Sequence, residues 1–130
     1  MSNRPVTPGG DLEIALLTAL WARHEATVRE LYEAVGEPRG TVYTTVAKVL
    51  DRLVEKRLVR RRREGRAFVY QPVAKRADTQ RAMARSLIRR LVGEDPQPAV
   101  AALVGALEDV SPALVEQLEA ELAARKGAKK

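Results

Sequence analysis

The sequence is poor in the residues that usually build chemical sites. It has no cysteine and one histidine, His24, and aromatic residues make up 4% of its 130 positions. Without cysteine the chain can form neither a disulfide nor a thiolate metal site, and a reducing compartment is compatible with this composition. One histidine provides neither a metal-ligand set nor an acid–base pair. Since the sequence also has no glycine-rich phosphate loop, nucleophile elbow or HExxH motif, we predict that it is not an enzyme and uses no metal or cofactor.

Long hydrophobic runs are missing as well. The two longest apolar-rich stretches, residues 14–22 and 99–107, are about half of the ~20 residues that a membrane span requires. The first ten residues, MSNRPVTPGG, lack the apolar run of a secretion signal. We therefore expect a cytoplasmic protein without membrane insertion. Its 45% apolar content is enough for a packed core, built mainly from Leu, Val and Ala.

Positive charge is concentrated in one part of the chain. The formal net charge is +6. Residues 48–76 contain 11 Lys or Arg against 3 acidic residues, a net charge of +8, so the remainder of the chain has a net charge of −2. A single basic stretch of this kind is typical of a nucleic-acid-binding surface.

The stretch Thr41–Lys56, TVYTTVAKVLDRLVEK, has the clearest helical pattern. At about 100° per residue, one face is apolar and the opposite face carries hydroxyls and charges. The apolar face holds Val42, Val46, Val49, Leu50 and Leu53, and the opposite face holds Thr41, Thr44, Lys48 and Asp51, with Thr45 and Arg52 on its flanks. This pattern predicts a helix with its back in a core and a polar face held out to a ligand, although a solvated face is the alternative.

The residues before this helix predict two further helices. A first helix over residues 11–23 has Asp11 as its expected N-cap and buries Leu16, Leu17, Leu20 and Trp21. Thr27 and Glu30 have the spacing of a capping box that opens a short second helix. We expect Gly36 to lie just after its C-terminus and Pro38 to prevent its continuation. The short link 36–40 between two amphipathic helices is the pattern of a helix-turn-helix.

A basic hairpin is expected after the helical pattern ends. An extended segment from Leu58 to Arg63, a turn at Glu64-Gly65 and a return segment from Ala67 to Tyr70 favour two antiparallel strands. Three helices and a hairpin form a winged helix-turn-helix, so residues 11–75 are expected to be a DNA-binding domain. The fold class is mainly α with a small β-hairpin wing.

DNA contacts are expected from the polar face of the predicted helix and from the wing. The N-terminal part of such a helix meets base edges in the major groove, where Thr, Lys and Arg are suitable partners. In a strand, alternate side chains point to opposite faces, so only Arg60 with Arg62, or Arg61 with Arg63, can share a face. The predicted DNA-binding residues are Thr41, Tyr43, Thr44, Thr45, Lys48, Arg52, Arg60, Arg62 and Arg66. For Tyr43, packing competes with phosphate contact.

Three more helices are expected after Pro72, at about 78–92, 97–108 and 111–125. Their apolar stripes are too large for short helices to bury alone, so residues 76–125 are predicted to be a helical dimerisation region. The expected dimerisation residues are Met83, Leu87, Leu91, Leu103, Leu107, Leu114, Leu118 and Leu122, an intrachain core being the alternative. Arg81, Arg85 and Arg89 form a stripe that contacts a partner or flanking DNA, or is simply solvated. Residues 1–10 are expected to be a flexible arm and 126–130 a frayed basic tail.

The runs Leu20–Val35 (LWARHEATVRELYEAV) and Tyr43–Pro72 resemble the penicillinase and methicillin-resistance repressors. This resemblance implies a homodimer on a dyad-symmetric operator and control of a β-lactam-resistance or cell-envelope operon. It also implies a possible membrane-bound sensor protease that cuts the dimer region at an Asn-Phe step. The corresponding region here reads VAALVGAL, with Leu103 and Val104 as the possible regulatory cleavage region and with neither Asn nor Phe. A copper-sensing branch of the family uses C-terminal cysteines, which this chain lacks.

The sequence therefore predicts a sequence-specific transcriptional repressor whose partners are double-stranded operator DNA and a second copy of itself. A non-specific architectural DNA-binding protein is the alternative, because the same charge distribution suits both. A third possibility is a protein–protein module with a winged fold and no DNA target, since a fold does not fix a function.

Overall fold

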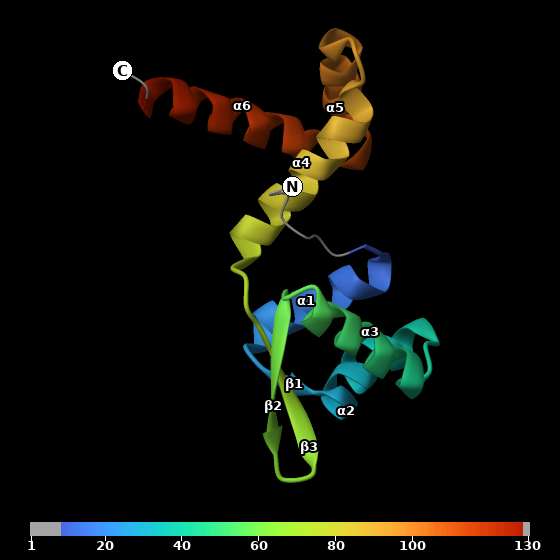
Figure 1. Cartoon of the computed structure of the whole chain (residues 1–130). Coiled ribbons are helices and arrows are strands. Elements are labelled where there is room, and N and C mark those ends of the chain that lie inside the picture. The colour runs from blue at the N-terminus through green and yellow to red at the C-terminus, as the bar shows by residue number, and fades with distance from the viewer. Residues whose placement is uncertain (1–8, 129–130) are drawn as a thin grey trace. The chain divides into compact units, whose positions relative to one another are not determined.

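The computed structural model describes residues 9–128 and divides the chain into an N-terminal unit, residues 1–85, and a C-terminal unit, residues 86–130. The N-terminal unit begins with helix α1 (Asp11–Arg23), strand β1 (Ala26–Thr27) and helix α2 (Val28–Leu31). A π-helical turn (Tyr32–Gly36) and a 3-10 turn (Glu37–Arg39) then lead to helix α3 (Tyr43–Glu55). The hairpin β2 (Val59–Glu64) and β3 (Ala67–Pro72) follows, and Figure 1 shows it extending past the helices as a wing. The expected winged helix-turn-helix fold, mainly α with a small β-hairpin, is confirmed.

The core of the N-terminal unit lies between α1, α2, α3 and the base of the hairpin. The predicted stripes supply most of it: Leu16, Leu17 and Leu20 of α1 are buried there, and so are four of the five predicted apolar residues of α3, all except Val42. Its fully buried large side chains are Leu16, Leu17, Leu20, Leu31, Val46, Leu50, Leu53 and Val59. Burying one such side chain contributes about 1.5–3 kcal/mol, so this core is sufficient to hold the face of α3 in place. Trp21 lies at its edge and donates from Nε1 to the carbonyl of Ala74, 3.1 Å away.

The sheet has one strand more than the sequence pattern indicates. The two residues of β1 pair antiparallel with β3, with Ala26 opposite Tyr70, which gives the strand order β1-β3-β2. Two residues are too few to show alternation, so the sequence gives no signal for this strand. The pairing matters because it fixes the wing to the turn that opens α2.

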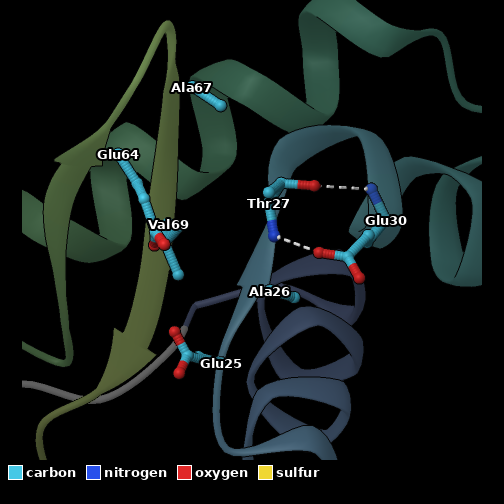
Figure 2. A pocket seen from close by; sticks show the side chains of 7 residues that line it. All are labelled: Glu25, Ala26, Thr27, Glu30, Glu64, Ala67 and Val69. Atoms are coloured by element: carbon cyan, nitrogen blue, oxygen red, sulfur yellow. Dashed lines mark hydrogen bonds between the residues drawn. The ribbon is translucent and has the colours of Figure 1, made fainter.

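Capping explains where the helices of the N-terminal unit begin. Thr27 Oγ1 accepts from the Glu30 amide at 3.2 Å and the Glu30 carboxylate accepts from the Thr27 amide at 2.9 Å, which confirms the capping box (Figure 2). These bonds hold the pKa of Glu30 below its ordinary value, the bond from the Thr27 amide first. At α1, the expected N-cap was wrong by one residue. Gly10 occupies that position and Asp11 is the first helical residue.

The link between the two helices of the helix-turn-helix differs from the sequence prediction. Gly36 was expected after the helix end, but it lies in the π-helical turn with φ −72° and is buried. A β-carbon there would meet Val46 Cγ2 at 2.7 Å, so the close approach of α3 requires glycine. Pro38 lies within the 3-10 turn, and the left-handed residue that ends the link is Gly40, with φ 72°.

The C-terminal helices are α4 (Arg76–Val92), α5 (Pro96–Val110) and α6 (Pro112–Ala128). The division between the two units falls within α4. Asp95 caps α5 by accepting from the Gln97 amide at 3.2 Å, and α5 and α6 pack against each other in the C-terminal unit. The frayed tail expected from residue 126 was wrong for residues 126–128, which continue α6, whereas 129 and 130 lie outside the described residues. Eight of the ten residues of the expected N-terminal arm, 1–8, also lie outside them.

Candidate nucleic-acid interface

Helix α3 presents an exposed polar face. Thr44, Thr45, Lys48 and Arg52 are all exposed, while Val46, Val49, Leu50 and Leu53 on the other side are buried. Among residues 9–128, neither Lys48 nor Arg52 takes part in a salt bridge. Their cationic groups are therefore available to an external anion or base edge.

The N-terminus of α3 departs from the predicted pattern. Val42 was expected on the buried face, but it is the N-cap in extended conformation and is 60% exposed. Thr41 precedes the helix and is half-buried, with its amide donating to the carbonyl of Gly36 at 2.9 Å. No side chain caps this helix end. The amides of Thr45 and Val46 donate to the Val42 carbonyl at 3.1 and 3.2 Å, so the amides of Tyr43 and Thr44 are the ones that could meet a phosphate.

Tyr43 joins the start of α3 to the helix before it. Its ring lies edge-on to that of Tyr32, with centroids 5.6 Å apart and planes at 63°, and the guanidinium of Arg29 lies 5.5 Å above it. Tyr43 is 41% exposed, and Arg29 is exposed as well. Cation–π stacking holds the Arg29 charge beside the exposed end of α3. Arg29 is not among the DNA-binding residues predicted from the sequence. Its position two residues after the capping Thr27, at the start of a helix, was the available signal.

One face of the wing is tied to α3. Arg61 donates to Asp51 of α3 at 2.7 Å, and its guanidinium lies 4.4 Å from the centroid of the Phe68 ring. Arg63, two residues further along the same face, lies 5.7 Å from that ring. The Tyr70 hydroxyl first, and Asp51 after it, raise the pKa of Arg61. We call Asp51, Arg61, Arg63 and Phe68 the wing clamp, because it fixes the wing's angle to α3 and groups two guanidinium ions on the side where α3 lies.

The other face of the wing is tied to the segment before β1. Arg62 donates to Glu25 at 2.5 Å and to Glu64 at 3.1 Å, and these carboxylates raise its pKa, Glu25 first. Arg60, on the same face, lies 3.4 Å from the Gln71 side chain. Beside them is a cavity of about 360 Å³ lined by the polar residues Glu25, Thr27, Glu30 and Glu64 and by the apolar residues Ala26, Ala67 and Val69 (Figure 2). Arg60 and Arg62 therefore lie on the face that does not meet α3, and Arg62 already has two anionic partners.

The tip of the wing is a two-residue loop. Glu64 pairs with Ala67, so Gly65 and Arg66 form the turn, and Gly65 has φ 63°. A glycine with positive φ in the first loop position is what a tight hairpin requires. Arg66 is exposed at this tip and forms no salt bridge within the part of the chain that the structure describes.

A buried ion pair joins the start of α1 to the end of α3. The Glu13 carboxylate is 3% exposed and accepts from Lys56 Nζ at 2.9 and 3.1 Å, and from the amides of Gly9 and Gly10. Burial by itself would raise the pKa of Glu13, but the hydrogen bonds from Gly9, Lys56 and Gly10 together bring it below the ordinary value of 4.5. This pair fixes the C-terminal end of α3 against α1.

The predicted dimerisation residues are mostly not buried within the chain. Leu87 is 57% exposed, Leu91 47% and Leu122 49%, whereas Met83, Leu103, Leu107, Leu114 and Leu118 are half-buried. Leu103 and Val104, the possible cleavage region, are half-buried within α5 and thus not in an extended loop. The structure contains no second chain, so the dimer stays a prediction.

Two classes of site have no counterpart in residues 9–128. No group of three or more His, Cys, Asp or Glu side chains is placed to hold a metal ion there. None of the helices described is both long and apolar enough to cross a membrane.

Comparison with known proteins identifies a family for this chain. The family model "Penicillinase repressor" matches residues 9–124, which is most of the chain. The transcriptional regulator BlaI of Mycobacterium tuberculosis, in two strains, is 49% identical over 65 residues, which are 49% of this chain and 47% of that protein. The chain thus spans about half the length of the curated relatives it matches.

Solved structures support the fold. The solution structure of the DNA-binding domain of the repressor BlaI matches 60% of this chain and 93% of its own, with a TM-score of 0.51 and 24% identity. The hsRosR-S1 complex matches 82% of this chain and 95% of its own, with a TM-score of 0.50 and 17% identity. At these identities the likeness concerns the fold alone. With the family model covering residues 9–124, we conclude that this chain belongs to the penicillinase repressor family.

Proposed function

We propose that the protein is a sequence-specific transcriptional repressor that binds operator DNA as a homodimer. The observation that carries the proposal is the uncovered face of α3, where Thr44, Thr45, Lys48 and Arg52 are exposed on a helix whose other side is locked into a core. Such a face fits the major groove, in which Thr can contact thymine methyl groups or base edges and Lys or Arg can contact guanine. The solved BlaI relative is a repressor DNA-binding domain.

The flanking groups then contact the DNA backbone. The uncapped start of α3, with Thr41 and Tyr43 beside it, suits one phosphate, and Arg29 stacked on Tyr43 suits the next. On the wing, we place the contact at Arg66 of the tip and at Arg61 and Arg63 of the wing clamp. Arg60 and Arg62, expected from the sequence to contact DNA, take a lesser role because they lie on the face that carries Glu25 and Glu64.

The dimer follows from the C-terminal helices, whose exposed leucines need a cover. Two winged units joined in this way would bind two half-sites about one helical turn, or a multiple of it, apart on a dyad-symmetric operator. The regulated genes would belong to a β-lactam-resistance or cell-envelope operon. Induction by a membrane-bound sensor protease would require local unfolding of α5 around Leu103 and Val104, because an extended chain is needed for cleavage.

The test is a competition titration on the DNA upstream of the protein's own gene. We expect specific binding tighter than binding to scrambled DNA by at least ~10³, and a fall in affinity of ~10³–10⁵ between 50 and 200 mM salt. Steep salt dependence without any sequence preference would support the architectural protein instead. If the protein bound no DNA even at low salt, a protein–protein module with a winged fold would be the remaining function.

Two substitutions separate base contact from backbone contact. Lys48→Ala should cost about 1–3 kcal/mol of operator affinity and change the preferred base at one position. Arg66→Ala should weaken binding to operator and scrambled DNA by the same factor and reduce the salt dependence. Normal operator binding by Lys48→Ala would mean that α3 enters the groove in another orientation.

A further inference from the structure

Three arginines of α4 form a stripe that nothing in the described chain neutralises. Arg81, Arg85 and Arg89 are exposed and repeat at every fourth residue, and none takes part in a salt bridge within residues 9–128. Like charges at this spacing on a helix repel one another. An anionic surface lying against the stripe would relieve this repulsion more than solvent and salt do.

The same chain carries a surface of matching charge. Residues 75–90 contain six Lys or Arg and one acidic residue, a net charge of +5. Residues 91–128 contain seven acidic residues and two Lys or Arg, a net charge of −5. Within residues 9–128, only Glu121 of those seven acidic residues forms a salt bridge, with Arg125 on its own helix.

Each charged set has apolar residues of its own helix beside one of its edges. At about 100° per residue, Arg81, Arg85 and Arg89 fall within about 80° of one another on α4, next to Ile88, which is 41% exposed. On α6, Glu116 and Glu119 are exposed and about 60° apart, and Glu119 lies within about 60° of Val115 and of Leu122, the latter 49% exposed. A helix pair with apolar residues in the seam and opposite charges along its edge has the pattern by which paired helices select their partner.

We propose that, in the homodimer, the arginine stripe of α4 lies against Glu116 and Glu119 on α6 of a second copy of this chain. This inference rests on the dimer of the proposed function and specifies which surfaces meet. The arginines set the register of the apolar contact and exclude a pairing of α4 with α4, which would place like charges together. In a two-fold symmetric dimer the contact occurs twice.

A charge-swap experiment on the full chain tests the pairing. The first variant is Arg85→Glu with Arg89→Glu, and the second is Glu116→Arg with Glu119→Arg. Each changes four contacts of the symmetric dimer, each worth about a two- to five-fold change in affinity. We therefore expect sedimentation equilibrium to show each variant's dimer dissociation constant raised roughly 20- to 600-fold. A 1:1 mixture of the two variants should recover a heterodimer, because the charges become complementary again.

The matched control is Glu108→Arg with Asp109→Arg, a double charge reversal at two exposed positions of α5 that the proposed pairing does not use. It should leave the dimer close to wild type, and circular dichroism should show unchanged helix content in all variants. Rescue only in the mixture supports the pairing, whereas weakening of both variants without rescue overturns it. Dimerisation of both variants at wild-type strength also overturns the pairing. If, in that case, the first variant alone lost DNA affinity, the arginine stripe of α4 would be assigned to flanking DNA.

The outcomes distinguish this inference from the proposed function. If the wild-type chain stayed monomeric at all concentrations, both the proposed homodimer and the proposed pairing would be wrong. A wild-type dimer that binds no DNA would remove the repressor function and leave the pairing intact.

Discussion

The two parts of this chain differ in how far they bury their apolar side chains. In the N-terminal unit, twelve buried residues from α1, β1, α2, α3 and the hairpin form one core. In residues 86–128, Ala99 is the only buried residue, while Leu87, Ile88 and Leu91 are more than 40% exposed. A domain with a closed core can hold a rigid binding face alone. Helices with open apolar stripes need a cover, so we propose recognition for the first part and assembly for the second.

Removing the assembly part should have the largest effect. A chain ended after Arg85 keeps the Trp21–Ala74 hydrogen bond and the whole core, so we expect it to fold as a monomer. Each winged unit then loses its tethered neighbour, and affinity for a full operator should fall by ~10² or more. Sedimentation and titration with one or two half-sites measure this. A truncated chain that remained dimeric would place the interface in the winged domain.

Replacing one leucine in each part should show the same difference between the two parts for single side chains. Leu50 is 0% exposed, and Leu50→Ala should lower the free energy of unfolding of the N-terminal unit by about 2–5 kcal/mol. Leu87→Ala, at a side chain that is 57% exposed, should change that value by less than about 0.5 kcal/mol and weaken the dimer instead. Denaturant unfolding of dilute protein, paired with sedimentation, separates the two effects. Equal destabilisation by both substitutions would show that Leu87 belongs to a core within the chain.

The buried pair between Glu13 and Lys56 predicts a pH dependence for the N-terminal unit alone. Because the pKa of Glu13 is lowered on folding, its contribution is complete above its ordinary pKa of 4.5 and is lost as the pH falls through the lower, folded value. Lys56→Met should cost about 1–3 kcal/mol at neutral pH. As the pH falls, the Lys56→Met variant should also begin to lose stability at a higher pH than wild type. The reason is that burial without Lys56 disfavours the charged form of the Glu13 carboxylate.

The control for this effect is Glu13→Gln, which should flatten unfolding stability between pH 3 and pH 5, roughly the range of carboxylate titration. Urea unfolding at several pH values measures each profile. If wild type and Glu13→Gln lost stability in parallel below pH 4.5, the ordinary pKa of Glu13, the pair would not contribute to acid stability.

The smallest expected effect concerns the wing clamp. Phe68 is 37% exposed and supports Arg61 and Arg63, so Phe68→Ala should leave the fold intact. Each stacking contact is worth about 0.5–1 kcal/mol at an exposed site, and we expect a similar loss of affinity, equal for operator and scrambled DNA. Phe68→Leu keeps the apolar contact and removes the ring, which makes it the matched control. A change in base preference would mean that Phe68 itself reaches the bases.

Much of the recognition surface could be predicted from the sequence, because α3 has a strong periodic pattern. Val46, Val49, Leu50 and Leu53 are buried, and Lys48 and Arg52 are exposed, as the pattern indicates. The prediction failed at Val42, because periodicity cannot show where a helix begins when no side chain caps it. It also missed Arg29, whose position beside Tyr43 depends on how two helices cross.

The wing shows what the sequence leaves open. Alternation determined that Arg60 and Arg62 share one face and Arg61 and Arg63 the other, but no local pattern tells which face meets α3. The structure decides this through Asp51, which binds Arg61, and through Glu25, which binds Arg62. Both acidic partners are ten or more residues away in the chain.

The sequence alone determined the helices, the hairpin, the basic stretch and the surplus of leucines after Pro72, because each is encoded by periodicity, capping or composition over a few neighbouring residues. Tertiary structure alone decided the β1–β3 pairing, the need for glycine at position 36 and which face of the wing meets α3. The physical reason is that these features depend on distances between segments remote in the chain, which are fixed only when the core is packed.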